Sequence, residues 1–396
     1  MKTVKSLLLG SATALVAFTG AQAADLPVAE PVEYVKVCST YGDGFFYIPG
    51  TNTCLKIGGL ARTDLYVTGN TDKRDNEDST RWDIRGRLNA DARSETEWGT
   101  LRSFIELEGR VDPSDNENNR AVMRFGFVQF SGLTVGFASS FYDFLEYSFV
   151  NDIFSDERVA QAAYTAAFGN GFSATIAVEN RGDREVGFSQ DDLYGSQTWP
   201  NAVAALRIDQ AWGSAQLSGA LQQNRPNADF AGDTDSKLAW AAQAGVSVNL
   251  PFFGTEGSNV WVQGAYTQGA LSYIGAEDAF GNKATGKLDN DDFLIGDFAV
   301  DADGQIRQTE AYAVGGGFNL QWSPTVVTGV AGYYAHLDQK DGNPNAKFYQ
   351  ALLNTTWTPV KGLSLGLEGS YTQLDVAGSA PNDHVWGGIA RVARKF

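Results

Sequence analysis

Apolar and polar side chains alternate with a period of two along most of this sequence. The alternation is clearest in residues 80–93, where every second residue is polar and usually charged. The positions between them are Trp82, Ile84, Gly86, Leu88, Ala90 and Ala92. Because successive side chains of a β-strand point to opposite faces of a sheet, this period predicts strands that are apolar on one face and polar on the other.

Sixteen such segments follow one another to the last residue, Phe396. We expect strands at 55–68, 80–93, 98–111, 120–130, 133–139, 158–168, 172–180, 201–212, 214–223, 237–250, 258–269, 309–321, 325–337, 346–358, 362–374 and 384–396. Short connections made of turn residues, such as Ser131-Gly132, alternate with connections of at least eight residues. Strict alternation would place every long loop at the same end, and the number of strands is even. Both features are typical of bacterial outer-membrane barrels.

The predicted fold class is therefore all-β: a 16-stranded antiparallel transmembrane β-barrel. Most of the strands have 10 to 14 residues, enough to cross a bilayer when tilted. Closure removes the sheet edges, whose backbone groups lipid cannot satisfy. The polar faces would point inward, and a barrel of this width leaves an aqueous channel.

The third long connection, residues 140–157, is called loop 3 below. It and its two flanking residues combine large apolar side chains with acids. The apolar ones are Phe141, Tyr142, Phe144, Leu145, Tyr147, Phe149, Ile153 and Phe154, and the acids are Asp143, Glu146, Asp152, Asp156 and Glu157. Such a segment suits a place between a wall and water, so we expect a constriction loop folded into the barrel.

The first residues predict export. Lys2 and Lys5 precede an apolar run that ends near the small-residue site Ala21-Gln22-Ala23, which indicates a signal peptide at 1–23. Its removal would change the net charge from −17 to −19, because it holds two lysines and no acid. This charge argues against nucleic acid as a partner. We expect an N-terminal lead at 24–54, a barrel domain at 55–396, and a location in the bacterial outer membrane.

Cys38 and Cys54 are the two cysteines of the chain. Export implies an oxidising compartment, so a structural disulfide is expected, worth about 3 kcal/mol in the chain-entropy estimate. Zinc is the alternative, but a zinc site needs about four ligands. His336 and His384 are distant in sequence. We expect no metal and no cofactor.

The N-terminal block resembles a known family. The carrying residues are Tyr34-Val35-Lys36-Val37-Cys38, Tyr41-Gly42, Gly44-Phe45-Phe46-Tyr47-Ile48-Pro49-Gly50-Thr51 and Thr53-Cys54-Leu55-Lys56-Ile57-Gly58-Gly59, with Phe127-Val128-Gln129-Phe130 and Ser140-Phe141-Tyr142-Asp143-Phe144 further on. Together they resemble the alphaproteobacterial porins of the rhizobial and Brucella type. The resemblance implies a homotrimer in contact with outer-membrane lipid and lipopolysaccharide. It also implies passive diffusion of small hydrophilic solutes and ions through an eyelet narrowed by loop 3.

In porins, basic residues on the wall face acids of loop 3 across the narrowest point. Alternation turns seven arginines of the first four strands inward: Arg62, Arg81, Arg85, Arg87, Arg102, Arg110 and Arg124. We expect the pore constriction to consist of Arg62, Arg85, Arg87, Arg102, Arg124, Asp143 and Glu146. The alternative is that these arginines pair with Asp83, Asp91, Glu106 and Glu108 on the wall.

The long connection 270–308 is rich in acids, including Asp297 and Asp301, and would concentrate cations at the mouth. This favours a weak cation preference, which an anion-selective reversal potential would contradict. Asp301-Ala302-Asp303-Gly304 resembles the start of a calcium loop but lacks the downstream glutamate, so a solvated acidic loop is the better interpretation.

Other functions remain as alternatives. A substrate-specific channel could use Tyr66, Phe104, Tyr142 and Tyr147 as a sugar track. An enzyme is disfavoured, because Gly362-Leu363-Ser364-Leu365-Gly366 matches a nucleophile elbow but lies in a predicted strand. His336 is expected to face inward, with no matched serine or carboxylate. Phe125 and Phe127 are expected to face outward, toward lipid or a neighbouring subunit.

Overall fold

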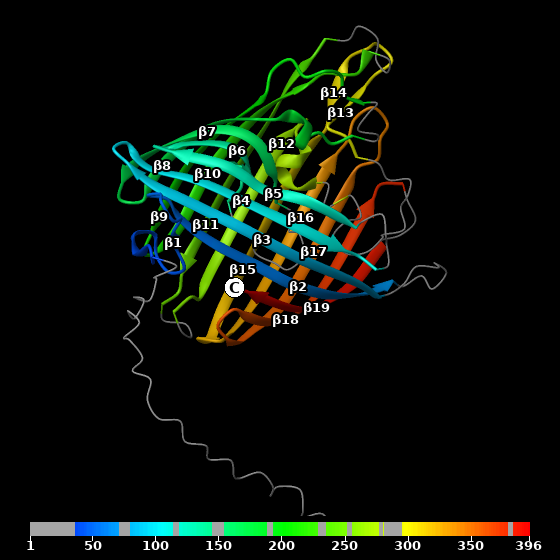
Figure 1. Cartoon of the computed structure of the whole chain (residues 1–396). Coiled ribbons are helices and arrows are strands. Elements are labelled where there is room, and N and C mark those ends of the chain that lie inside the picture. The colour runs from blue at the N-terminus through cyan, green and yellow to red at the C-terminus, as the bar shows by residue number, and fades with distance from the viewer. Residues whose placement is uncertain are drawn as a thin grey trace, which may run out of the picture.

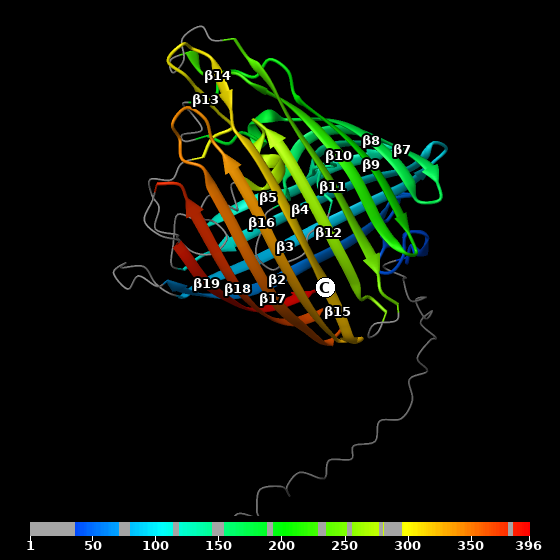
Figure 2. The same cartoon turned by 180° about the vertical axis from the view of Figure 1, so that it is seen from behind.

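The computed structural model describes residues 36–70, 80–113, 119–144, 154–187, 193–228, 235–251, 256–276, 280, 295–378 and 383–396. Sixteen antiparallel strands form one closed wall (Figures 1 and 2). They are β2 (Cys54–Asn70), β3 (Thr80–Thr96), β4 (Gly99–Val111), β5 (Arg120–Phe130), β6 (Leu133–Ser139), β7 (Arg158–Gly169), β8 (Phe172–Glu179), β9 (Asn201–Gln210), β10 (Gly213–Asn224), β11 (Lys237–Asn249), β12 (Asn259–Gln268), β15 (Glu310–Ser323), β16 (Val326–Asp338), β17 (Ala346–Val360), β18 (Leu363–Val376) and β19 (Asp383–Lys395). The last strand pairs with the first, Arg391 opposite Asp64, which closes the barrel. The predicted 16-stranded barrel is confirmed.

The connections alternate in length, with one exception. The turns β5–β6, β7–β8, β9–β10, β15–β16 and β17–β18 are tight, and Ser131 and Asn170 adopt positive φ angles of 49° and 51° there. The end of β11 and the start of β12 lie at the same end of the barrel, and the nine residues that join them outnumber the seven of the 339–345 connection at the other end. The alternation is therefore not strict, although most long loops do share one end, as expected.

Exposure follows the predicted period of two. Along β3, for example, Trp82, Ile84 and Leu88 are exposed, whereas Asp83 and Asp91 are buried inside the barrel. Outside, the barrel thus presents apolar side chains to its surroundings, while charged side chains line the β2–β4 part of the interior. Among the described residues, no helix is long and apolar enough to span a membrane.

A β-bulge changes the phase of β5. Glu106 of β4 pairs with Phe125, but the next residue, Leu107, pairs with Met123, so Arg124 is the extra residue. Such an insertion shifts which face the neighbouring side chains occupy. Phe125 and Phe127 therefore lie on the inner face, opposite Glu106 and Phe104. The expectation that these two rings face outward is wrong, because simple alternation carries no sign of a bulge.

The long-loop end carries an outward belt of aromatic rings. Its members pack in neighbouring pairs: Trp240 with Tyr266, Tyr312 with Tyr334, Tyr334 with Tyr349, and Tyr371 with Trp386. His336 belongs to this belt, with its ring 5.4 Å from that of Tyr312. The expectation that His336 faces inward is wrong: buried Tyr333, Ala335 and Leu337 define the inner phase of β16. Belts of this kind mark a membrane interface.

The N-terminal segment forms a disulfide-closed loop on β2. After η1 (Ser39–Tyr41), β1 (Phe46–Tyr47) pairs with β2, with Phe46 opposite Leu55. Cys38 and Cys54 are bonded, with their Cα atoms 5.9 Å apart, as predicted. Phe45 is buried, and its ring receives the guanidinium of the inward Arg93 at 5.0 Å. The predicted signal peptide at 1–23 lies outside the described part of the chain.

Loops fill part of the interior. Phe154 of loop 3, Val186, and Leu271 and Ile274 of η4 (Leu271–Ile274) are buried against inner side chains of β12 and β15–β19. The wall side of this cluster includes Trp261, Tyr333, Leu337, Phe348, Leu352, Leu374 and Val385. The hairpin of β13 (Phe298–Val300) and β14 (Ile306–Gln308) stands at the long-loop end (Figure 1). The interior is thus not uniformly polar: the wall opposite the arginines carries an apolar core.

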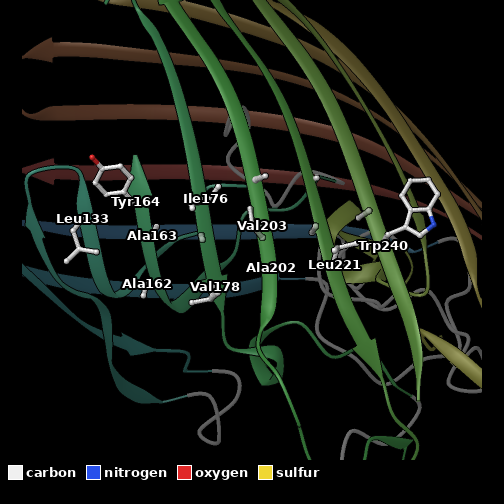
Figure 3. A pocket seen from close by; sticks show the side chains of 15 residues that line it. Leu133, Ala162, Ala163, Tyr164, Ile176, Val178, Ala202, Val203, Leu221 and Trp240 are labelled. Atoms are coloured by element: carbon white, nitrogen blue, oxygen red, sulfur yellow. The ribbon is translucent and has the colours of Figure 1, made fainter. Parts of the chain in front are cut away.

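The outer face also holds an apolar groove of about 820 Å³ across β6–β11. Figure 3 shows Leu133 and Tyr164 at one end of it, Trp240 at the other, and Ala162 and Ala202 between them. Small side chains, mostly alanines, form the floor of this groove. Larger apolar side chains stand at neighbouring positions.

Ser364 lies in β18, which continues to Val376. No helix follows it there, so the Gly362–Gly366 motif is not a nucleophile elbow.

Candidate functional site: a row of arginines on the inner wall

Four arginines of adjacent strands stand side by side on the inner wall. Arg62 of β2 is directly opposite Arg85 of β3, Arg85 is opposite Arg110 of β4, and Arg110 is opposite Arg120 of β5. Like charges that face each other across strands destabilise a sheet. A row of four is therefore a costly arrangement, and costly arrangements of charge are commonly retained for function.

Carboxylates shared between pairs of arginines reduce this cost. Asp64 binds Arg62 at 3.1 Å and Arg391 at 2.7 Å. Asp83 binds both Arg85 and Arg110 at 2.8 Å. Each of these acids is fully buried and serves two guanidinium groups, so the row keeps an excess of positive charge. The side chains of Arg62 and Arg85 remain 14% and 20% exposed, open toward the interior.

Arg87 and Arg124 lie next to the row, toward the short-turn end. Arg87 donates to Glu108 at 2.5 Å, and Arg124 binds Glu106 at 3.0 Å and Glu108 at 3.3 Å. These two arginines are balanced by two glutamates. The alternative, that arginines pair with acids on the wall, therefore holds for Asp83, Glu106 and Glu108. It also holds for Asp91, which binds Arg93 and Arg102.

Arg102 lies further from the row. It is opposite Arg93, near the short turn between β3 and β4, and both arginines bind Asp91, at 3.0 and 2.7 Å. Arg102 also donates to Gln129 Oε1 at 2.9 Å. Of the five predicted arginines, the structure thus brings Arg62, Arg85, Arg87 and Arg124 together and places Arg102 in a separate layer.

Both described ends of loop 3 lie against the inner wall. The carbonyl oxygen of Tyr142 accepts hydrogen bonds from Gln216 at 2.9 Å, from Ser218 at 2.7 Å and from Gln243. These three residues belong to β10 and β11, so the loop crosses from β6 past the intervening strands β7, β8 and β9. Tyr142 is fully buried, which removes it from the group of residues that could line a sugar track.

Two glycines of the wall make room for phenyl rings of loop 3. A Cβ on Gly245 of β11 would overlap the ring of Phe144, 2.7 Å from its Cε1 atom. A Cβ on Gly315 of β15 would lie 3.0 Å from Cε2 of Phe154. Both separations are below normal van der Waals contact. Each end of loop 3 is thus seated at a position where the wall has no side chain.

A buried arginine joins loop 3 to its neighbours. Arg184 follows η3 (Arg181–Asp183) and donates to Ser155 Oγ at 2.6 Å and to Glu179 Oε2 at 3.4 Å. Its guanidinium lies 4.3 Å from the ring centre of Tyr273 and 3.8 Å from Asp143 Oδ1. Arg184 therefore links both ends of loop 3 to β8 and to η4.

Asp143, a predicted constriction acid, is engaged in this cluster. Its Oδ2 atom accepts the amide of Glu157 at 2.9 Å, so it bridges the two ends of loop 3. Burial raises the pKa of Asp143 to about 8, against the opposing attraction of Arg184. The structure thus pairs Asp143 with Arg184. Glu146 lies outside the described residues.

Asp297 is a second buried junction. Its carboxylate accepts the amides of Val186 at 3.0 Å and Leu271 at 2.6 Å, the side chain of Gln222 at 3.1 Å, and the hydroxyl of Tyr194. Burial raises its pKa to about 7, and these donors oppose the rise. The expectation that Asp297 belongs to an acidic rim is wrong: it is fully buried and ties two long loops, β8–β9 and β12–β15, to β10.

Asp301 closes the β13–β14 hairpin. Its side chain accepts the amides of Asp303 at 3.0 Å and Gln305 at 2.8 Å, and Arg307 at 2.7 Å. These bonds hold the pKa of Asp301 below its usual value. The Asp301–Gly304 motif therefore stabilises the hairpin turn, and this role accounts for it without calcium binding. Within the described ranges, no cluster of three or more His, Cys, Asp or Glu side chains could hold a metal ion.

Sequence reasoning missed several parts of this site. Arg120 was not among the expected inward arginines, and Arg184 and Gly245 gave no local signal. The register of β2–β5 is what aligns Arg110 and Arg120 with Arg62 and Arg85. Register depends on pairing between strands, and the alternation within one strand does not contain it.

Comparisons with known proteins agree with this architecture. The Porin subfamily model matches residues 25–391. Porin Omp2b of Brucella neotomae and of Brucella abortus strain 2308 are each 34% identical to this chain, with 99% of both sequences covered.

Among solved structures, the outer membrane channel DcaP of Acinetobacter baumannii has a TM-score of 0.68 at 18% identity, covering 88% of this chain and 99% of DcaP. The anion-selective porin from Comamonas acidovorans has a TM-score of 0.55 at 13% identity, covering 87% of this chain and all of the other. At these identities the structures support the fold alone. With the family match and the Omp2b relatives, the conclusion is that this chain belongs to the Porin subfamily and is a channel of the bacterial outer membrane.

Proposed function

We propose that small hydrophilic solutes and ions diffuse through an eyelet between the arginine wall and loop 3. The wall contributes Arg62, Arg85, Arg87 and Arg124, joined by Arg110 and Arg120 and, one layer away, by Arg102. Loop 3 contributes Asp143 and Glu146. In the proposed orientation, the long loops lie outside the cell and both chain ends lie in the periplasm. Solutes that enter from outside would therefore contact the long loops first.

The observation that carries this proposal is the row Arg62–Arg85–Arg110–Arg120. Four facing cations weaken the sheet, yet their guanidinium groups stay partly exposed to the interior and are not fully neutralised. A charged surface in a narrow passage attracts ions of opposite sign and orients dipolar solutes.

The excess of arginine at the wall favours anions. Among the described side chains of β2–β5 and β19, the inner face carries ten arginines, from Arg62 to Arg391, and six carboxylates: Asp64, Asp83, Asp91, Glu95, Glu106 and Glu108. The acidic connection at 270–308 predicts the opposite sign, but most of its acids lie outside the described residues. We propose that the wall dominates, because its charges stand in the narrow part of the passage.

Planar-bilayer recordings in a KCl gradient test both parts of the proposal. We expect ohmic steps and a reversal potential of the anion-selective sign. Neutralising the row with R62Q, R85Q and R110Q should shift the permeability ratio toward K⁺ by several-fold, since about 1 kcal/mol of lost attraction changes a ratio roughly fivefold.

The matched control is R207Q. Arg207 also faces inward, but it lies on β9 and is paired with Asp209 at 2.8 Å. A cation-selective parent channel would show that the acidic loop dominates. If R207Q shifted selectivity as much as the triple variant, the arginine row would not be the selective element.

A sugar-specific channel remains a second candidate because Tyr66 and Phe104 face the interior, with Tyr66 4.7 Å from the guanidinium of Arg81. Tyr142 is buried, and Tyr147 falls among the residues without a described position. Addition of maltose or glucose distinguishes the two functions. Current that is blocked by one sugar and saturates would favour the specific channel, whereas no block favours general diffusion.

We also propose that the chain assembles as a homotrimer surrounded by outer-membrane lipid and lipopolysaccharide. Membership of the porin family, which suggests an oligomeric channel, and the apolar outer wall support this. Chemical cross-linking in native outer membranes should yield a trimer band that boiling abolishes. A monomer under all cross-linking conditions would contradict the proposal.

A further inference from the structure

Three phenyl rings stand together on the inner wall. Phe104 of β4 and Phe127 of β5 are directly opposite each other, and the bulge at Arg124 brings Phe125 to the same face. The rings of Phe104 and Phe127 are 5.4 Å apart and nearly parallel, with an angle of 27°. Phe125 meets both edge-on, at 6.0 and 6.4 Å. We call this group the phenyl cluster.

The phenyl cluster is only half-buried. Each of its three rings keeps an intermediate exposure, although each lies on the inner face. Aromatic rings on the outer face of a membrane barrel contact lipid, which is favourable. A ring cluster on the charged inner wall is exposed to water, and the hydration of its apolar surface is unfavourable. Loop residues cover other apolar groups of the interior. The loop residues that the structure describes leave the phenyl cluster half-exposed, so its rings remain available for contact.

Positive charge borders the cluster. The guanidinium of Arg102 lies 5.1 Å from the ring centre of Phe104 and 5.3 Å from that of Phe127. Arg102 shares the single carboxylate of Asp91 with Arg93, so this layer carries an excess positive charge. On the other side, Arg124 lies 5.8 Å from Phe125 but is balanced by Glu106 and Glu108. The uncompensated charge is therefore on the Arg102 side.

We propose that the phenyl cluster and Arg102 form a binding site for aromatic carboxylates inside the channel. The ring of the solute would pack against Phe104 and Phe127, and its carboxylate would bind Arg102, whose 27% exposed side chain can reach it. Aromatic rings associate beyond simple area burial, and arginine binds carboxylates with matched geometry. The site gives the channel a preference by chemical class, and it rests on the proposed diffusive function.

Benzoate is the probe for a bilayer experiment on the full chain, and KCl conductance without benzoate is measured first for every protein. We expect benzoate to block the current at concentrations roughly tenfold lower than acetate, which has the carboxylate but no ring. Benzyl alcohol, which has the ring but no charge, should block less than benzoate. Equal effects of benzoate and acetate would overturn the proposal.

Variants locate the site. F104L and F127L keep apolar bulk but remove the ring, and each should raise the blocking concentration of benzoate several-fold, as should R102Q. The control is Y66L, which alters another inward ring that lies beside an arginine but toward the long-loop end. Benzoate block that is weakened equally by Y66L, or unaffected by F104L, would contradict the site.

The two failures are distinguishable. A protein that gives no steps in KCl fails as a channel, whatever its response to benzoate. A protein that conducts normally but does not distinguish benzoate from acetate remains a channel and lacks the aromatic site.

Discussion

The two halves of the barrel interior are stabilised in different ways. On β2–β5 and the adjoining β19, charged side chains bind one another within the wall, and two acids, Asp64 and Asp83, serve four arginines. On β7–β18, the wall presents mostly small, apolar and uncharged polar side chains, such as Gln216 and Gln243, and loops supply the partners. Tyr142 and Tyr273, for example, pack over a surface of alanines with their rings 4.9 Å apart.

The difference separates two properties of a channel, the selectivity and the width of its passage. The arginine wall takes its geometry from strand register, so its charges are held by the hydrogen-bonded strands of the barrel. The loop-covered wall takes its geometry from buried junctions such as Arg184 and Asp297. Changes to the junctions should therefore alter the width of the passage, whereas changes to the arginines should alter its selectivity.

The largest effect is expected from R184A. Arg184 is 1% exposed and contacts Asp143, Ser155, Glu179 and Tyr273. Removing one partner of a buried ion pair usually costs about 3–5 kcal/mol, because the remaining charge stays buried. We expect loop 3 to detach and single-channel conductance to rise, with faster proteolysis at residues of loop 3.

R181A is the comparison for R184A. Arg181 is equally buried, but it binds Glu185 and the carbonyl of Gly195, within the neighbouring loop. It should leave the cleavage rate of loop 3 nearer to that of the parent. Unchanged conductance and proteolysis in R184A would show that Arg184 does not hold loop 3.

A smaller effect is expected from G245L. The added side chain would overlap Phe144, and overpacking typically costs about 1–3 kcal/mol. One end of loop 3 should be displaced while Arg184 still holds the other, so conductance should change less than in R184A. G369L is the control, because Gly369 of β18 has open space where its Cβ would lie. Equal effects of G245L and G369L would argue against a specific seat for Phe144.

Much of the fold could be predicted because the alternation within each strand shows which of its side chains share a face. The ends of the sixteen strands were predicted to within three residues, since alternation and turn residues are local. The bulge at Arg124 could not be predicted in this way, and it reversed the expected direction of Phe125 and Phe127. One inserted residue changes the face of every residue after it until the phase is restored.

The site was less predictable than the fold. The inward direction of Arg62, Arg85 and Arg87 follows from the period of two, but their alignment with one another and with Glu108 of β4 depends on pairing between strands. The roles of Arg184 and Asp297 depend on contacts between loops distant in sequence: Asp297 binds Val186, 111 residues away. A run of acids in a loop predicts a solvated surface, and only the tertiary structure shows that Asp297 is buried.

The smallest effect is expected from pH, through the junction at Asp297. Its pKa is raised by burial to about 7 in the docked loops, against an ordinary value of about 3.9 when the loops are released. Between these values the docked form binds more protons, so acid favours docking. Docking should be strongest below pH 4, weaken as pH rises toward 7, and stay constant above. Asp143, whose pKa is about 8, acts in the same direction.

Conductance measured between pH 4.5 and 8.5 tests this expectation, with the larger conductance expected at high pH. The groups that face Asp297 are Tyr194, Gln222 and the amides of Val186 and Leu271, and D297N removes the titration while keeping one acceptor oxygen. The pH dependence should weaken in D297N, where Asp143 still titrates, but persist in full in R85Q, which changes the other wall. A pH dependence that survives in D297N but vanishes in R85Q would move the titrating group to the arginine wall and remove the division of roles between the two halves.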